Sequence, residues 1–382
     1  MVVQRRRLSL LVVLWTLLMT SVACISASFG SSRGGRSNSP LRSSILTFSS
    51  SDGGANTAAS ANKAKPILVV GATGRVGRRV VQRLLGEGRP VRALVRNPEK
   101  AKEIFSTATK LEYPPIEIFV ADLGEYERYE NVLEKAVSGC DCILSMMGVV
   151  RFAKLSDFLP WRLFNWDVSS WADRDHPFYG NYLGQKKLIE LAERHKIKRF
   201  VRLTGLGLAN SPFNPFSILF NTLLSFNNRY GSLCEQALAA SKVPYVVLRP
   251  GGLAEDARNT NTTNIQVESS GVLPFPGRIG RSDVAALAVA ACNLPADKNF
   301  ILACRWCGDN IKPQPQGKKS DGQATADECI RHLIDTKATS PLPSPNLKPY
   351  AFPVAILVYS SLALALKLVW FLWNLALTLL HG

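Results

Sequence analysis

Three glycines spaced three residues apart are the part of this sequence whose residue types indicate a specific binding chemistry. Gly71, Gly74 and Gly77 follow the apolar run 67–70 and precede valines and a leucine at helical spacing. A dinucleotide pyrophosphate binds backbone N–H groups at a helix N-terminus and needs glycines for close approach. The strand–turn–helix context supports this interpretation of the GxxGxxG spacing, and a βα turn without a ligand is the alternative. The expected contacts of the loop are Gly71, Ala72, Thr73, Gly74, Arg75, Val76 and Gly77.

The end of the next apolar segment, residues 90–96, indicates which dinucleotide is bound. Enzymes that use NAD place an acidic residue there for the ribose 2′-hydroxyl, whereas an arginine suits a 2′-phosphate. Arg96 occupies this position, and Arg75 in the glycine loop supplies a second cation. A phosphate favours such a fork of donors, so we expect NADP(H) rather than NAD(H); two merely solvated arginines are the alternative. Further cofactor contacts are expected where later strands end, at Asp122, Leu123, Met147, Gly148, Pro250 and Gly251.

The cysteines indicate neither a metal site nor a disulfide framework. The chain has eight of them at irregular spacing, and Cys304 and Cys307 form a single CxxC pair. A zinc site needs a second pair of ligands, and none is well placed in the sequence. We therefore expect buried structural thiols, with a redox pair as the alternative, and no metal.

The elements that position these residues alternate between short β-branched runs and amphipathic helices. Expected strands cover residues 67–70, 90–96, 116–120, 142–148, 199–205, 243–248 and 300–303. This alternation is typical of an α/β fold with a doubly wound parallel sheet of the Rossmann type, here over residues 65–310. Two irregular stretches, 149–180 and 211–229, interrupt it. We expect the first to be a lid or binding loop, or to pack on its own domain.

A set of motifs in fixed order resembles the atypical short-chain dehydrogenase/reductases, with the NmrA-like NAD(P)-binding branch the most similar. The resemblance covers roughly residues 65–305. It implies a Rossmann-type sheet, NADP binding and a substrate region near the carboxyl ends of the strands. The motifs are GATGRVG at 71–77, the strand end at Arg96, ADL at 121–123, YLGQKK at 182–187, RPGGL at 249–253 and RSDVA at 281–285.

In catalytic members of this family, a serine or threonine precedes a tyrosine and a lysine four residues later, which together relay a proton. Thr204 and Tyr230 match the first two positions, but Cys234 stands where the lysine is expected and supplies no fixed charge. Lys186 lies in a GQK sequence that resembles plastid NmrA-like relatives and is a further candidate, with a structural or surface role as the alternative. The resemblance implies an NADPH-dependent oxidoreductase acting on a small molecule through these residues. The alternative is a non-catalytic NADP(H)-binding scaffold, redox sensor or assembly factor with a protein partner.

The N-terminal residues have the composition of targeting segments. Residues 1–28 carry arginines, an apolar core and then small residues, as in a secretory signal peptide. Residues 29–64 are rich in serine, glycine and alanine with Asp52 as the one acid, a transit-like composition that does not favour folding. The pair resembles a bipartite plastid presequence. We expect a plastid membrane, thylakoid or envelope, with a secretory-pathway membrane as the alternative.

The C-terminal part predicts attachment to a membrane. Residues 311–350 are polar and proline-rich, as in a linker, with one weak helix near 325–334. Residues 351–380 are almost wholly apolar apart from Lys367, so we expect one transmembrane helix, with an interfacial helix as the alternative. The net charge of +17 suits an anionic cofactor or membrane. No RNA-binding motif accompanies it, and we expect no nucleic-acid partner.

Overall fold

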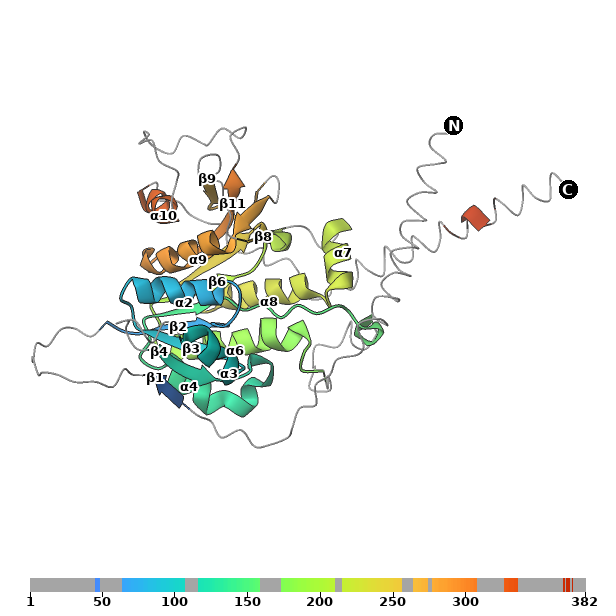
Figure 1. Ribbon diagram of the computed structural model, residues 1–382. Helices are drawn as coiled ribbons and strands as arrows, with labels where there is room; N and C mark the ends of the chain where they lie inside the picture. The colour runs from blue at the N-terminus through green and yellow to red at the C-terminus, as the bar shows by residue number, and fades with distance from the viewer. Residues whose placement is uncertain are drawn as a thin grey trace, which may run out of the picture.

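The computed structural model describes residues 45–48, 64–106, 116–158, 173–209, 215–255, 264–273, 277–307 and 326–335, and residues 367, 369–371 and 373. These residues form a nine-stranded sheet in the order β1-β4-β3-β2-β5-β6-β7-β11-β9 (Figure 1). The central strands run parallel, whereas β1 and β9 at the two edges run antiparallel to their neighbours. The strands are β1 Ile45–Phe48, β2 Ile67–Val70, β3 Val91–Val95, β4 Ile116–Val120, β5 Cys142–Ser145, β6 Arg199–Leu203, β7 Tyr245–Pro250, β9 Asn264–Glu268 and β11 Phe300–Cys307.

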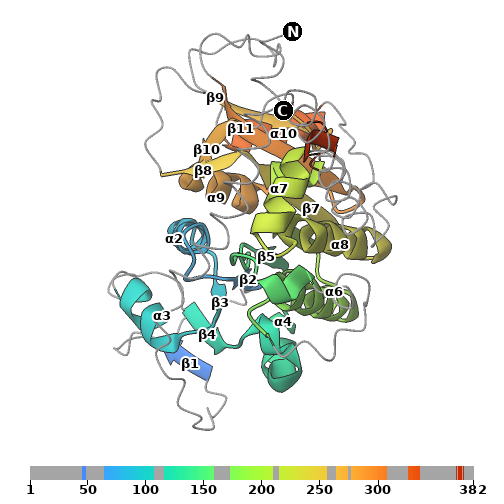
Figure 2. The same cartoon turned by 90° about the vertical axis from the view of Figure 1, so that its right-hand side faces the viewer.

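Helices cover both faces of the sheet, as Figure 2 shows. One face carries α2 Gly77–Gly86, α3 Pro98–Phe105, α9 Arg281–Ala290 and α10 Ala326–Asp335. The other carries α4 Glu130–Val137, α6 Gly184–Arg194 and α8 Asn227–Ala240. A strand covered on both sides is expected to be apolar throughout, and β2 is buried along its whole length. Shorter elements are η2 Leu123–Tyr129, η3 Leu155–Phe158, the π-helical η5 Phe178–Leu183, η6 Leu206–Ala209, α7 Pro215–Leu223, η7 Ala291–Asn293, and the parallel pair β8 Gly252–Ala254 and β10 Arg278–Gly280.

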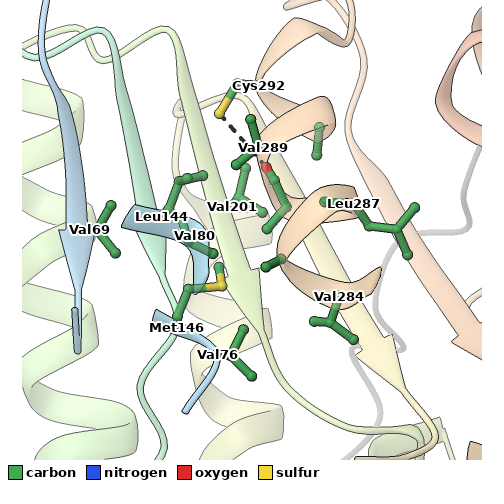
Figure 3. Packing of buried hydrophobic residues seen from close by; sticks show 14 of the residues in the cluster. Val69, Val76, Val80, Leu144, Met146, Val201, Val284, Leu287, Val289 and Cys292 are labelled. Carbon is green, nitrogen blue, oxygen red and sulfur yellow. Dashed lines mark hydrogen bonds between the residues drawn. The ribbon is translucent and has the colours of Figure 1, made fainter. Parts of the chain in front are cut away.

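The apolar core holds the first turn of α2 against the ends of the central strands. Val76 and Val80 lie in one cluster with Val284 and Leu287 of α9 and with Met146 just past β5 (Figure 3). Each of these side chains is at most 6% exposed. Full burial of an apolar side chain contributes about 1.5–3 kcal/mol, so this cluster fixes where the helix begins.

The predicted α/β fold with a doubly wound parallel sheet is confirmed, and a strand lies in each of the seven expected ranges. Three strands end earlier than predicted, at Val95, Ser145 and Leu203. The chain turns away from the sheet beyond these points. Arg96, Met147 and Thr204 therefore lie in loops at the carboxyl edge.

Two strands of the nine-stranded sheet were not predicted from the sequence. β1 pairs with β4 inside the segment 29–64, and β9 pairs with β11. The weak helix predicted near residues 325–334, within the expected linker, is confirmed as α10. Ile330 and Leu333 of this amphipathic helix are buried in the same core as α2 and α9. The folded domain therefore includes residues 326–335.

Most of the predicted membrane segment, residues 351–380, lies outside the described residues, as do residues 1–28 and most of 29–64. Lys367, Val369, Trp370, Phe371 and Trp373 are helical, and the four apolar side chains are 57–65% exposed. In the part of the chain that the structure describes, no helix is long and apolar enough to cross a membrane.

Candidate cofactor cleft

The three glycines of the loop 71–77 are required by its geometry. Gly71 has a φ of +75°, and a Cβ there would lie 2.8 Å from the Cβ of Met147. A Cβ on Gly77 would lie 2.1 Å from the carbonyl oxygen of Gly71, and one on Gly74 would lie 3.0 Å from that same oxygen. Side chains would therefore push the first turn of α2 away from β2. The loop has the close helix–strand approach that a pyrophosphate site needs.

A cleft of about 950 Å³ runs along the carboxyl ends of β2 to β6. Ala72 and Gly77 are buried behind the loop, and Pro250 and Gly251 belong to β7 and its end; these four do not line the cleft. The predicted residues that line it are Gly71, Thr73, Gly74, Arg75, Val76, Arg96, Asp122, Leu123, Met147, Gly148 and Thr204.

Arg96 and Lys100 form the cationic end of the cleft. Asn97 caps α3 by accepting a hydrogen bond from the Lys100 N–H at 2.8 Å, which holds both side chains beside the end of β3. In the described ranges, neither cation has a carboxylate within 4.0 Å. Next to them, Asp122 accepts from the N–H of Gly124 at 2.9 Å and so fixes the start of η2. This end can hold an anionic group beside a ribose.

Three arginines surround the carboxylate of Glu255, on the side of the glycine loop away from Arg96. This glutamate was not predicted from the sequence. Arg281 donates to it at 2.7 Å, and Arg79 lies 3.4 Å and Arg75 3.8 Å from its carboxylate. Arg79 also donates to the carbonyl oxygen of Arg75 at 2.6 Å. Arg75 is therefore already paired with a carboxylate, whereas Arg96 has no such partner in the described residues.

A buried polar layer lies under the cleft, between the sheet and α6. The Ser145 hydroxyl donates to Gln185 at 2.7 Å, and Arg202 donates to Ser145 at 3.1 Å and to the carbonyl oxygen of Met147 at 2.6 Å. Asn181 in the π-helical turn accepts from the N–H of Val149 at 2.7 Å and donates to its carbonyl at 2.8 Å. The layer therefore fixes the chain after β5, over which a cofactor would pass.

The three predicted catalytic residues are not brought together. Thr204 lines the cleft, and its hydroxyl donates at 2.9 Å to Glu235, which is also paired with Arg249 at 2.5 Å. Lys186 is exposed on α6 and does not line the cleft. Tyr230, in the first turn of α8, does not line the cleft either.

The Tyr230 ring is 2% exposed and packs edge-on against His176 and Phe178, with both ring centres 5.4 Å away. Burial raises the pKa of Tyr230 to about 12. A phenol in these surroundings is a poor proton donor to a substrate in the cleft. The position four residues later, Cys234, is fully buried in the apolar cluster under α8.

The two irregular stretches meet at the outer half of the cleft. Asp157 is fully buried and accepts from Arg151 at 2.8 Å and from Ser225 at 2.9 Å, which joins the first stretch to the second. Phe152, which is 63% exposed, lines the cleft, as does Asn227. Four other aromatic residues of the first stretch lie outside the described residues: Trp161, Phe164, Trp166 and Trp171.

Cys304 and Cys307 both lie on strand β11. Residues three apart on a strand point to opposite faces, so the two thiols do not meet. The seven cysteines that the structure describes are buried, and burial raises the pKa of the Cys304 thiol. Within that same part of the chain, no group of three His, Cys, Asp or Glu side chains could hold a metal.

The fold and the cleft together define a dinucleotide-binding protein of the Rossmann type. The chain belongs to the NAD(P)H-binding family, whose model matches residues 71–295. The resemblance to atypical short-chain dehydrogenase/reductases, expected from the motifs, is confirmed by this match and by the relatives.

Three relatives illustrate the range of proteins that share this domain. An uncharacterized chloroplastic protein of Arabidopsis thaliana is 28% identical over 61% of this chain and 74% of its own length. The chloroplastic protein TIC 62 of the same plant is 27% identical over 68% of this chain but 38% of its own length. Sanguinarine reductase of Eschscholzia californica is 23% identical over 70% of this chain and 95% of its own length. The chain thus spans well under half of TIC 62.

Proposed function

We propose that this protein binds NADP(H) at a plastid membrane and uses the cofactor as a reductase of a small molecule. The observation that carries the choice of cofactor is Arg96 beside Lys100, at the position where an NAD site has an acid. Both cations are without a carboxylate partner in the described residues, so they are available to a 2′-phosphate. Arginine and lysine together provide the donors that such a dianion favours.

The outer half of the cleft supports a substrate role. A dinucleotide bound along the glycine loop would extend from Arg96 toward Thr204, and the cleft continues past it to Phe152 and Asn227. An exposed aromatic ring and an amide would favour a planar substrate with a polar edge. The relation to sanguinarine reductase, over nearly all of that protein, favours the same assignment.

A second function, a non-catalytic NADP(H)-binding scaffold, redox sensor or assembly factor, is favoured by one specific observation. Tyr230 and Lys186, which would have carried the proton transfer, both lie away from the cleft. Thr204 is the one member of the expected trio that lines it. A protein of this kind would bind the cofactor without using it to reduce a substrate.

A plastid membrane is proposed from two observations. Two of the relatives described above are chloroplastic, and residues 1–64 have the composition of a bipartite presequence. The tryptophans Trp370 and Trp373 are exposed on a helix within the apolar segment 351–380, which we propose as the membrane anchor.

The first experiment compares NADPH and NADH binding to the full chain, purified in detergent, for wild type, Arg96→Ala and Arg128→Ala. Arg128 is exposed and lies outside the cleft, so it controls for the loss of a surface charge. We expect an NADPH preference that falls at least about tenfold in Arg96→Ala, or 1.4 kcal/mol, and is unchanged in Arg128→Ala. Equal binding of both nucleotides by wild type would refute the NADP(H) assignment.

A turnover assay then separates the two functions. Substrate-dependent oxidation of NADPH across a panel of quinones, iminium ions and aldehydes would support the reductase. Tight NADPH binding with no turnover across the panel would favour the scaffold or sensor.

A further inference from the structure

Arg202 is a buried cation in the floor of the cleft. Its side chain is 2% exposed, projects from strand β6 toward α6 and α8, and lines the cleft. Two of its hydrogen bonds go to the Ser145 hydroxyl and to the carbonyl of Met147. Its Nε has no hydrogen-bond partner, and no carboxylate lies within 4.0 Å of the guanidinium, in the part of the chain that the structure describes. The charge of this guanidinium is therefore only partly compensated within the protein, so it acts on whatever occupies the cleft.

The guanidinium lies beside the position from which the expected lysine is missing. Thr204, on the same face of the chain two residues after Arg202, donates to Glu235, and Cys234 precedes that glutamate on α8. Burial raises the pKa of the Cys234 thiol, and the neighbouring Arg202 guanidinium opposes that rise. Glu235 is itself paired with Arg249. The Arg202, Glu235 and Arg249 side chains therefore leave one net positive charge under the cleft.

The place of Arg202 in the sheet shows which part of a dinucleotide would meet it. In a Rossmann fold the pyrophosphate lies at the glycine loop and the adenosine on the side of the strand that carries the ribose-binding residue. That strand is β3, with Arg96. β5 and β6 lie on the opposite side of β2, so Arg202 faces the nicotinamide half.

We propose that Arg202 supplies, from strand β6, the fixed positive charge that helix α8 lacks at Cys234, and that this charge makes the cleft select the reduced cofactor. The proposal rests on the NADP(H) binding proposed above. The oxidised nicotinamide ring carries a positive charge and the reduced ring carries none. A buried cation beside the ring repels the first and not the second. Such a site takes up NADPH and releases NADP⁺, which serves a reductase and a sensor of the NADPH pool alike.

The test measures dissociation constants for NADPH and NADP⁺ with the full chain, for wild type, Arg202→Gln and Arg202→Lys. Glutamine keeps an N–H donor for Ser145 and Met147 but removes the charge; lysine keeps the charge. We expect wild type and Arg202→Lys to bind NADPH about tenfold or more tightly than NADP⁺, and Arg202→Gln to lose most of this ratio. A further variant, Arg202→Gln with Cys234→Lys, returns the charge from α8 and should restore the ratio.

The outcomes separate this inference from the proposed function. Wild type that binds neither nucleotide refutes both. Wild type that binds NADPH, with the same ratio in a folded Arg202→Gln variant, refutes the role of Arg202 alone. If Arg202→Gln does not fold, Arg202→Met takes its place: a lost ratio supports the role of the charge, and a retained ratio overturns it. A purely structural role would change the melting temperature without changing the ratio.

Discussion

Replacing Gly77 by alanine should damage the cofactor site from within the protein core. The added Cβ would lie 2.1 Å from the carbonyl oxygen of Gly71 and 3.0 Å from the Cα of Ala72, both main-chain atoms that no rotamer change can move. Overpacking of this kind costs about 1–3 kcal/mol, and the better helix propensity of alanine returns at most about 1 kcal/mol. The relief is a shift of α2 away from β2, which displaces the N–H groups that would bind the pyrophosphate.

Gly86→Ala is the matched control, since it makes the same change at the other end of the same helix. A Cβ there meets nothing within 4 Å, and the variant should be more stable by about 0.5–1 kcal/mol. For a domain of this size, 1 kcal/mol corresponds to about 2–4 °C in melting temperature. Thermal unfolding with and without NADPH should therefore show Gly86→Ala slightly above wild type, with the full NADPH shift. The melting temperature of Gly77→Ala should lie below that of wild type and should rise little when NADPH is added. A rise as large as in wild type would refute the glycine-loop assignment.

Four further predictions concern groups buried in the core. Tyr230→Phe should leave any NADPH-dependent turnover within about twofold of wild type, because the ring lies outside the cleft; a large loss would restore the tyrosine as the proton donor. Burial raises the pKa of Tyr230 to about 12, so the unfolded chain releases this proton first and about 2–3 kcal/mol of stability is lost as the pH rises from 10 to 12. Thermal unfolding across that range should show a smaller loss for Tyr230→Phe. Glu235→Gln leaves the buried Arg249 without its carboxylate and should cost about 3–5 kcal/mol in denaturant unfolding. Glu134→Gln, whose partners Arg194 and His195 lie at the surface, should cost about 1 kcal/mol or less. A chain that ends at residue 310 lacks α10 and should melt several degrees below one that ends at residue 340; equal melting temperatures would exclude α10 from the folded core.

The cofactor half of the cleft could be predicted from the sequence because its chemistry is local. A few adjacent residues determine each of its features: a glycine at positive φ, a glycine packed against a carbonyl oxygen, and an arginine just past the end of a strand. Gly71, Gly77 and Arg96 therefore lie where their spacing indicated. The spacing also placed Ala72 and Pro250 among the contacts. Ala72 belongs to the glycine turn and Pro250 ends strand β7, and both side chains are buried away from the cleft.

The positions of the expected catalytic residues could not be predicted in the same way because they depend on how helices pack. Tyr230 has the expected position along the chain, yet its exposure is decided by His176 and Phe178 from the first irregular stretch, 149–180. Glu255 is brought to the glycine loop by β8, which pairs with β10 over more than 20 residues of intervening chain. No spacing rule in one sequence carries such contacts.

One signal of the polar layer was nevertheless present in the sequence. The strand 199–203 reads RFVRL, and two arginines within a strand covered on both faces each require a compensating partner. At the amino end, Arg199 donates to the carbonyl oxygens of Tyr245, Leu294, Pro295 and Lys298, and so joins the sheet to the chain after α9. At the carboxyl end, Arg202 has one carbonyl and one hydroxyl as acceptors, and it lines the cleft. Both leave Nε without a partner among the described residues, so that atom does not distinguish them. Access to the cleft does distinguish them. Arg199 has main-chain oxygens as partners for most of its donors, which is typical of a structural role. Arg202 has fewer acceptors and lies at the floor of the cleft, where its charge can act on a ligand.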